Sequence, residues 1–246
     1  MLARSACRLS VNVNKIALLR NSRGGHRPNL LAVAADIEHF GADGITVHPR
    51  PDERHVRYAD LAPLRAQTAG EFNIEGYPDE RWLRAVLEVR PAQATLVPDA
   101  PDALTSSAGW DTRRHQHRLA EVCAELRRAG IRSSIFIDAD PAMAEGAARC
   151  GADRVELYTG PYAEQYLGNK QAAVAPYIIA ARAATAAGLG LNAGHDLDLD
   201  NLTWFYRHIP QLEEVSIGHA LVADALYYGL ENVVRMYQAA LARAHA

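Results

Sequence analysis

Short β-prone runs alternate with helix-prone stretches along the whole chain, and this alternation restricts the fold more than any other feature. The runs are rich in Val, Ile, Thr and Phe, whereas the intervening stretches repeat apolar residues at helical spacing. The runs cover residues 10–14, 44–48, 72–75, 94–98, 134–138, 154–159, 191–195 and 214–219. A strand–helix unit repeated eight times predicts an α/β fold, the closed parallel (β/α)8 or TIM barrel.

The length of 246 residues suits one such barrel, which needs about 250 residues, so we expect a single domain over residues 1–246. Several helix-prone stretches end in a glycine just before the next run, namely at Gly41, Gly130, Gly151 and Gly188. A glycine in this place supplies a left-handed helix end. The predicted helices cover residues 30–40, 60–68, 79–89, 113–129, 141–150, 171–187, 199–208 and 220–244.

Composition excludes several classes of protein. Apolar residues make up 49% and charged residues 22%, which is typical of a globular protein in water. The formal net charge is −3 and no Lys/Arg-rich run occurs, so nucleic acid is not an expected partner. No apolar stretch reaches the length of a membrane span, and the N-terminal residues lack the apolar core of a signal peptide. With three cysteines and no CxxC pair, we expect a cytoplasmic protein.

Ionisable residues stand at the ends of several predicted strands. These residues are His48, Glu75, Glu156, His195 and His219. A barrel places the carboxyl ends of all strands on one rim, where the active sites of such barrels lie. Because an unpaired buried charge is costly, a cluster of this kind predicts a functional pocket rather than a structural core. Imidazoles and carboxyls suit repeated proton transfer.

Features of anion binding occur on the same rim. The segments 192–195 and 218–220 follow the seventh and eighth strands and contain glycines that let a backbone approach a phosphate closely. The first two loops after strands carry Arg20, Arg23, Arg50 and Arg54, which could bind phosphate with two hydrogen bonds each. Together these features predict two anionic groups, carried by two phosphorylated substrates or by one bisphosphate. The long loop 99–112 is expected to be a lid or binding loop, or else a mobile surface loop.

Metal and cofactor chemistry has weaker support. His48, His195, His219 and Asp138 could form a metal cluster of the hydrolase type, but the first strand carries Asn12 and Asn14 where such an enzyme would have a histidine pair. A Schiff-base aldolase would place a lysine within a strand, whereas Lys15 follows the first strand. Neither GxGxxG nor a Walker motif occurs. We therefore expect neither a metal nor an organic cofactor.

A set of motifs, in order along the chain, resembles the pyridoxine 5′-phosphate synthase family. The motifs are the segments 12–24 (NVNKIALLRNSRG), 41–50 (GADGITVHPR), 73–75 (NIE), 96–98 (LVP), 136–138 (FID), 192–195 (NAGH) and 217–219 (IGH). The resemblance runs from about Val11 to the C-terminus. It implies a (β/α)8 barrel with additional short helices, assembled as a homo-octamer and requiring no cofactor.

The resemblance also implies an activity. Members of the family condense 3-amino-2-oxopropyl phosphate with 1-deoxy-D-xylulose 5-phosphate to give pyridoxine 5′-phosphate, phosphate and water. By motif, His48 resembles the proton acceptor, Glu75 the second base, His195 the proton donor and Glu156 the carboxylate that stabilises a transition state. Asn12, Arg23, Gly218 and His219 match residues that hold the aminoketone phosphate, and Arg50, His55 and Thr105 match those that hold the deoxyxylulose phosphate.

Two positions depart from the family pattern. Asn14 and Lys15 stand where many members have Asp-His, and Asp196 stands where the usual residue is glycine. We expect Asn14, Lys15 and Asp196 to contact substrate, although a lysine cannot reproduce an imidazole's proton transfer and Asp196 brings negative charge near a phosphate. Two alternatives stay open: another barrel enzyme acting on a phosphosugar, such as an isomerase or aldolase, and a catalytically inactive barrel that binds ligands.

Overall fold

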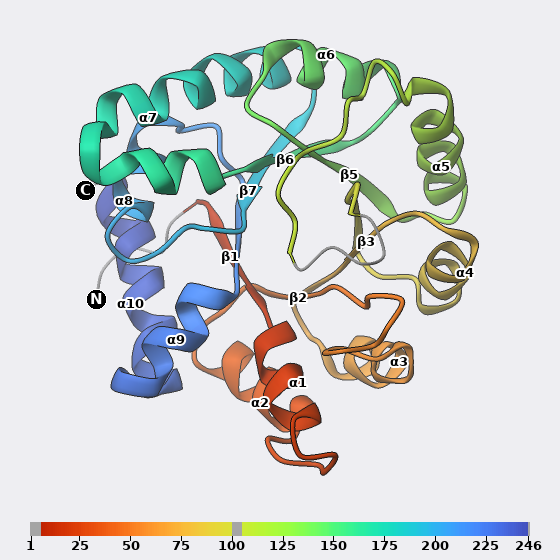
Figure 1. Cartoon of the computed structure of the whole chain (residues 1–246), viewed down its shortest axis with the longest axis vertical. Coiled ribbons are helices and arrows are strands. Elements are labelled where there is room, and N and C mark those ends of the chain that lie inside the picture. Colours follow the sequence, from red (N-terminus) through yellow and green to blue (C-terminus); the bar gives the residue numbers. More distant parts are fainter. Residues whose placement is uncertain (1–5, 100–104, 246) are drawn as a thin grey trace.

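Eight parallel strands form a closed barrel at the centre of the protein (Figure 1). The computed structural model describes residues 6–99 and 105–245. Each strand pairs with the next one in sequence, and β8 pairs with β1 to close the barrel, with Arg8 beside Glu214. The strands are β1 (Arg8–Asn12), β2 (Gly44–Val47), β3 (Glu71–Gly76), β4 (Gln93–Leu96), β5 (Arg132–Ile137), β6 (Arg154–Tyr158), β7 (Gly190–Gly194) and β8 (Glu214–Ile217). The predicted TIM barrel is confirmed.

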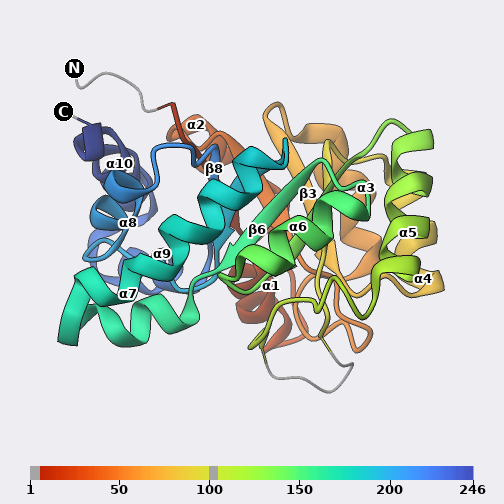
Figure 2. The same ribbon diagram turned by 90° about the horizontal axis from the view of Figure 1, so that it is seen from above.

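Helices surround this barrel on the outside (Figures 1 and 2). They are α1 (Asn14–Asn21), α2 (Leu30–His39), α3 (Tyr58–Gln67), α4 (Glu80–Val89), α5 (Gln116–Arg128), α6 (Pro141–Arg149), α7 (Gly160–Ala186), α8 (Leu202–His208), α9 (His219–Tyr228) and α10 (Leu230–Ala242), followed by a short 3-10 turn, Arg243–His245. No helix among the described residues combines the length and the apolar character needed to cross a membrane.

The helices differ from the prediction in three places. Helix α1 was not predicted, because its apolar residues, Ile16 to Leu19, are consecutive and show no helical spacing. Helix α7 begins eleven residues earlier than expected and is kinked at Asn169, whose φ of −156° and ψ of 91° are not helical. The single helix predicted over 220–244 is two helices, because Gly229 takes a left-handed φ of 79° between α9 and α10.

The glycines predicted to end helices do so. Gly41, Gly130, Gly151 and Gly188 have φ values of 116°, 73°, 74° and 78°, in the region where a residue with a Cβ is strained. After each of the four, the chain enters the next strand within three residues. These tight connections lie at the end of the barrel opposite to the candidate site, which leaves the other rim to the longer loops.

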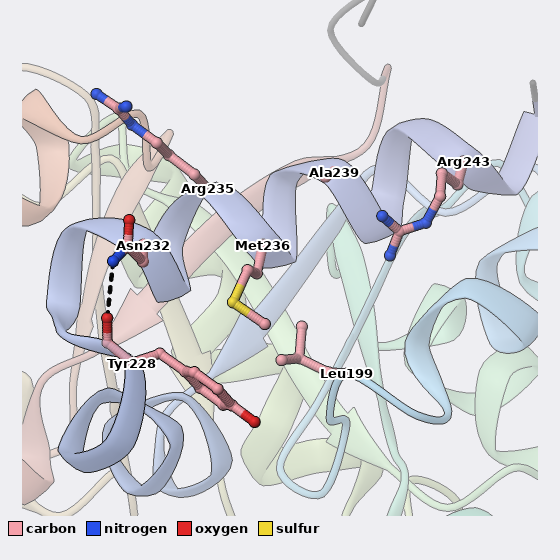
Figure 3. A pocket seen from close by; sticks show the side chains of 7 residues that line it. All are labelled: Leu199, Tyr228, Asn232, Arg235, Met236, Ala239 and Arg243. Carbon is pink, nitrogen blue, oxygen red and sulfur yellow. Dashed lines mark hydrogen bonds between the residues drawn. The ribbon is translucent and has the colours of Figure 1, made fainter.

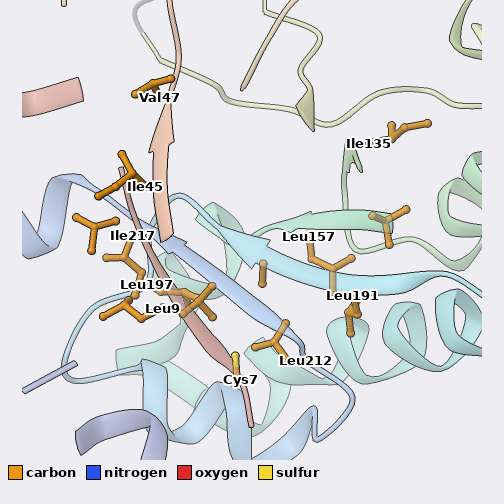
Figure 4. Close-up of a cluster of buried hydrophobic side chains, with 14 of the residues drawn as sticks. Cys7, Leu9, Ile45, Val47, Ile135, Leu157, Leu191, Leu197, Leu212 and Ile217 are labelled. Carbon is orange, nitrogen blue, oxygen red and sulfur yellow. The ribbon is translucent and has the colours of Figure 1, made fainter. Parts of the chain in front are cut away.

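Residues of each strand alternate between two environments. One set is apolar and packs against the helices, as Leu9, Ile45, Val47, Leu157 and Ile217 do in a buried cluster (Figure 4). The other set is polar and faces the barrel interior. These inward side chains hydrogen-bond from strand to strand: Ser10 Oγ lies 2.7 Å from Thr46 Oγ1, and Thr95 Oγ1 donates to Asn73 at 3.1 Å. Because side chains alternate with a period of two, polar residues line the inside of the barrel as far as the carboxyl ends of the strands.

Candidate active site

A cavity of about 530 Å³ lies at the carboxyl ends of the strands. It is lined by all the residues that the family motifs place at the site, except Arg23. These residues are Asn12, Asn14, Lys15, His48, Arg50, His55, Glu75, Thr105, Glu156, His195, Asp196, Gly218 and His219. They come from the ends of seven strands, all but β5, or from the loops that follow, so side chains far apart in sequence share one cavity.

Two of the predicted arginines lie elsewhere. Arg23 is exposed in the turn after α1 and does not line the cavity. Arg20 is buried, and its guanidinium donates two hydrogen bonds to the carboxylate of Asp60, at 2.8 and 2.9 Å. Arg20 also donates to the carbonyl oxygen of His55 at 3.3 Å. The expectation that Arg20 binds an anion is therefore replaced by a structural role, in which it fixes the loop that carries His55.

His48 and Glu75 form the central acid–base pair. His48 Nδ1 lies 3.7 Å from Glu75 Oε2, and both side chains are almost enclosed. Burial, assisted by the charge of Arg50, holds the pKa of His48 well below its ordinary value of 6.5. Burial and the nearby carboxylate of Asp99 raise the pKa of Glu75 to about 8. At neutral pH the pair therefore consists of a neutral imidazole and a protonated carboxyl, and the imidazole can accept a proton.

Glu156 is the second buried carboxyl of the cavity. Burial and the neighbouring Glu75 raise its pKa well above the ordinary value. Gly194 of β7 leaves the space that this side chain occupies, since a Cβ there would come within 2.4 Å of Glu156 Oε1. Two enclosed carboxyls of this kind can store and release protons within the site.

The end of β1 positions both members of the central pair. Asn12 Nδ2 donates to Glu75 Oε2 at 3.3 Å, and Asn12 Oδ1 accepts from the backbone of Asn14. Asn14 Oδ1 in turn accepts from the backbone N–H of His48 at 3.0 Å. Asn14, predicted as a substrate contact, thus also holds the backbone at the end of β2.

Arg50 and His55 present hydrogen-bond donors at one side of the cavity. Arg50 is buried and donates to Asp99 Oδ2 at 2.5 Å, and Ser106 Oγ donates to the same oxygen at 2.7 Å. His55 Nδ1 accepts from the backbone of Val56, so its proton resides on Nε2 in the neutral form. Burial and the neighbouring Arg50 lower the pKa of His55 to about 4, which keeps the ring neutral at pH 7.

The opposite side of the cavity is formed by the segment after β7 and the start of α9. His195 has a left-handed φ of 98°, and its Nε2 lies 2.7 Å from Thr105 Oγ1. Gly218 precedes α9, whose first residue is His219, so the free N–H groups of this helix begin at the cavity wall. A Cβ at Gly218 would lie 3.0 Å from Asn12 Cβ, which shows how closely the ends of β1 and β8 approach.

Several lining residues were not predicted. They are Leu18, Val97, Ser106, Phe136 and Ser216. Arg54, which was predicted as an anion contact, also lines the cavity. Ser216 and Phe136 could have been found, because each stands on the inward side of its strand near the carboxyl end. Ser106 could not, since it lies in the loop after β4, whose sequence has no periodicity that would show which side chains face the cavity. Residues 100–104 of the predicted lid lie outside the described residues. Asp138, considered as a metal ligand, is exposed and accepts from the backbone of Gly109 at 2.9 Å.

Two further observations limit the alternatives. Within residues 6–99 and 105–245, no group of three or more His, Cys, Asp or Glu side chains is arranged to hold a metal ion.

A second hollow of about 540 Å³ lies away from the strand ends, between α9, α10 and the loop before α8 (Figure 3). It is lined by Leu199, Tyr228, Asn232, Arg235, Met236, Ala239 and Arg243. The acid–base groups described above do not line this second hollow.

Comparison with known proteins identifies the family of this chain. Residues 9–243 match the family model described as pyridoxal phosphate biosynthesis protein PdxJ. The chain belongs to this family. A pyridoxine 5′-phosphate synthase of Cytophaga hutchinsonii is 59% identical over 230 residues, which is 94% of this chain and 97% of that protein. The enzyme of the same name from Porphyromonas gingivalis is 58% identical over 235 residues, covering 96% and 99%. The family resemblance read from the motifs is thus confirmed.

Solved structures outside the PdxJ family share the fold. Thiamine phosphate pyrophosphorylase from Pyrococcus furiosus matches with a TM-score of 0.63 at 10% identity, over 99% of each chain. Phosphoribosylanthranilate isomerase from Thermotoga maritima matches with a TM-score of 0.60 at 13% identity, over 96% of this chain and 98% of that one. At these identities the likeness extends to the barrel alone.

Proposed function

We propose that this PdxJ family member is a pyridoxine 5′-phosphate synthase, which joins 3-amino-2-oxopropyl phosphate to 1-deoxy-D-xylulose 5-phosphate and releases phosphate and water. The observation that carries the proposal is the single cavity in which two imidazoles and two buried carboxyls lie between two groups of anion-binding donors. Family membership and relatives of the same name at up to 59% identity support it. The substrates themselves come from the family resemblance.

The phosphate of the aminoketone is assigned to the end of β8. There the backbone N–H groups at the start of α9, beginning at Gly218, favour an anion through their partial positive charge. Asn12 and His219 line the same wall, and Lys15 adds a cation at the rim. Arg23 lies outside the cavity and keeps its place in this site only through the family resemblance.

The phosphate of the deoxyxylulose derivative is assigned to the side formed by Arg50 and His55. Arg50 offers a planar guanidinium that is already oriented by Asp99, and a guanidinium binds phosphate through paired N–H donors. His55 offers an Nε2–H donor because its Nδ1 accepts from the backbone. Thr105 supplies a hydroxyl at the cavity rim.

The acid–base groups then have distinct tasks. His48 is unprotonated at neutral pH and is assigned as the proton acceptor. Burial keeps Glu75 protonated at neutral pH, and an incoming ammonium group of the aminoketone favours its ionised form, in which it serves as the second base. His195 is assigned as the proton donor, and Glu156, by the family resemblance, as the carboxylate that stabilises a transition state. Successive condensation, loss of water and phosphate, and ring closure need several such transfers.

Two further features belong to this proposal. A homo-octamer is implied by the family resemblance, and exposed apolar side chains give it physical support: Leu167, Leu226 and Tyr227 are 90%, 79% and 87% exposed. Light scattering after size-exclusion chromatography should give eight times the mass of one chain. We also assign the enzyme to the cytoplasm, because Cys7, Cys123 and Cys150 are buried thiols that form no disulfide with one another, as expected in a reducing compartment.

The test is direct synthesis from the two substrates. Purified protein, treated with a chelator, is incubated with both compounds, and pyridoxine 5′-phosphate and released phosphate are measured by chromatography and colorimetry. We expect equal amounts of both products, and none when either substrate is omitted. Binding of both substrates without product would indicate an inactive barrel. A covalent adduct on Lys15 after borohydride treatment would indicate an aldolase instead.

A further inference from the structure

The imidazole of His195 is held at both of its nitrogens. Nδ1 lies 2.5 Å from Asp196 Oδ2, and Nε2 lies 2.7 Å from Thr105 Oγ1. The edge of the ring meets Tyr158, with the two ring centroids 5.6 Å apart and an interplanar angle of 77°. The ring therefore has three neighbours that restrict its rotation, and only Asp196 is an acceptor that can receive the Nδ1 proton.

The backbone of this segment is fixed by buried residues on a neighbouring loop and helix. The N–H of Asp196 donates to Thr159 Oγ1 at 3.1 Å, and Asn201 Nδ2 donates to the carbonyl oxygen of Asp196 at 3.2 Å. Thr159 and Asn201 are both buried. His195 itself has a φ of 98°, a conformation that non-glycine residues rarely adopt unless their surroundings impose it. These hydrogen bonds fix the backbone position from which the Asp196 side chain extends.

The same contacts argue against a phosphate at Asp196. Its backbone N–H already donates to Thr159, and its carboxylate would repel an anion. The carboxylate instead has a partner of complementary chemistry, because an imidazole N–H or an imidazolium is the natural donor to it. The distance of 2.5 Å between Nδ1 and Oδ2 places the two groups in hydrogen-bond contact.

We propose that Asp196 is a positioning residue for the proton donor His195. Its carboxylate accepts the Nδ1–H bond, which fixes the tautomer and directs Nε2 into the cavity toward the position of Thr105. In its doubly protonated form, His195 donates the proton on Nε2, which leaves the neutral tautomer whose remaining proton on Nδ1 faces the carboxylate. This assignment rests on the proposed function, in which His195 is the donor. It also gives a reason for an aspartate at a position where many family members have glycine.

The contribution is orientation more than charge. The side chains of His195 and Asp196 are 27% and 40% exposed, so solvent screens the attraction between them. The tautomer of the ring is defined by which nitrogen carries the proton. Solvent screening of the charges does not weaken this preference in the same way. Loss of the carboxylate therefore affects the rate of proton donation rather than the binding of either substrate.

The test compares Asp196→Asn and Asp196→Gly with the control variant Glu164→Gln. The control removes one exposed carboxylate from α7, near Tyr158 on the same rim, without touching His195. We expect kcat to fall about tenfold or more in both Asp196 variants, while KM for each substrate stays within about twofold, since a positioned acid contributes about 10²–10⁴ to a rate. The control should keep the kinetics of the wild type.

A spectroscopic measurement separates positioning from a merely structural role. In protein labelled with ¹⁵N at its imidazole nitrogens, the His195 signals are identified by their absence in His195→Gln. We expect them to report a proton on Nδ1 in the wild type and in Glu164→Gln, and a mixture of tautomers in Asp196→Gly. An unchanged tautomer in both Asp196 variants would overturn the proposal, as would a raised KM for one substrate at unchanged kcat.

The two proposals can fail separately. If the wild type makes no pyridoxine 5′-phosphate, the proposed function is wrong, but the tautomer of His195 is still measured without substrate. If product forms normally while Asp196→Gly keeps the kcat and the tautomer of the wild type, only the role of Asp196 is wrong.

Discussion

Replacing Glu75 by glutamine should abolish activity and at the same time stabilise the protein at alkaline pH. The reason is that this carboxyl is buried beside His48 and its pKa is raised to about 8. A glutamine side chain has nearly the shape of the protonated carboxyl but can never ionise. The variant therefore removes the proton transfer, and it also removes the cost of a buried negative charge.

The size of the effect follows from proton linkage. Between the ordinary pKa of 4.5 and about 8, the folded state holds a proton that the unfolded state has lost. The contribution of this group to the free energy of unfolding is thus complete below pH 4.5. It falls by about 1.4 kcal/mol per pH unit as the pH rises from 4.5 to about 8. From pH 5 to pH 8, the wild type should lose about 3 kcal/mol through Glu75 that Glu75→Gln keeps.

A second contribution does not depend on pH. Asn12 Nδ2 and Ser216 Oγ lie 3.3 and 3.5 Å from the two carboxyl oxygens of Glu75, and a glutamine can accept from only one of them. The lost hydrogen bond costs about 1 kcal/mol at every pH. The variant should therefore be slightly less stable than the wild type at pH 5 and more stable at pH 8.

The assay is urea unfolding followed by tryptophan fluorescence at pH 5, 6.5 and 8, at one protein concentration. Glu88→Gln, which removes an exposed carboxylate from α4, serves as the control and should follow the pH dependence of the wild type. Turnover of Glu75→Gln should fall by about 100-fold or more, as expected when a general base is lost. A constant difference in unfolding free energy between wild type and Glu75→Gln from pH 5 to pH 8 would refute the reasoning.

Three further predictions concern the proposed roles. His48→Ala should abolish formation of pyridoxine 5′-phosphate while circular dichroism and urea unfolding show a folded protein, and normal turnover with both substrates present would exclude His48 as the proton acceptor. Thr105→Ala should raise KM for deoxyxylulose phosphate more than for the aminoketone, as measured by steady-state kinetics, and equal effects would contradict a contact to one substrate only. Arg50→Lys should raise KM for deoxyxylulose phosphate about tenfold, because a lysine cannot keep both the contact to Asp99 and a paired contact to phosphate; unchanged KM in steady-state assays would place that phosphate elsewhere.

The sequence alone determined the barrel fold and most of the residues that line the site. Eight runs of period two, separated by helix-prone segments with glycine ends, are sufficient for a closed parallel barrel, because local hydrophobic periodicity and backbone preferences are short-range properties. The barrel then requires that His48, Glu75, Glu156 and His195 share one rim, since each stands at the end of a strand. This juxtaposition needed only the topology, not the packing.

The tertiary structure decided the protonation states of those residues and which other residues line the site with them. Burial fixes the protonation of His48 and Glu75, and a sequence contains no measure of how completely a side chain is removed from water. Contacts between residues far apart in the chain separate Arg20, which is paired with Asp60, from Arg50, which reaches the cavity. The role of Asp196 depends on a distance of 2.5 Å to His195 and on anchors from other elements. Such distances are set by the whole packed barrel, which local sequence does not specify.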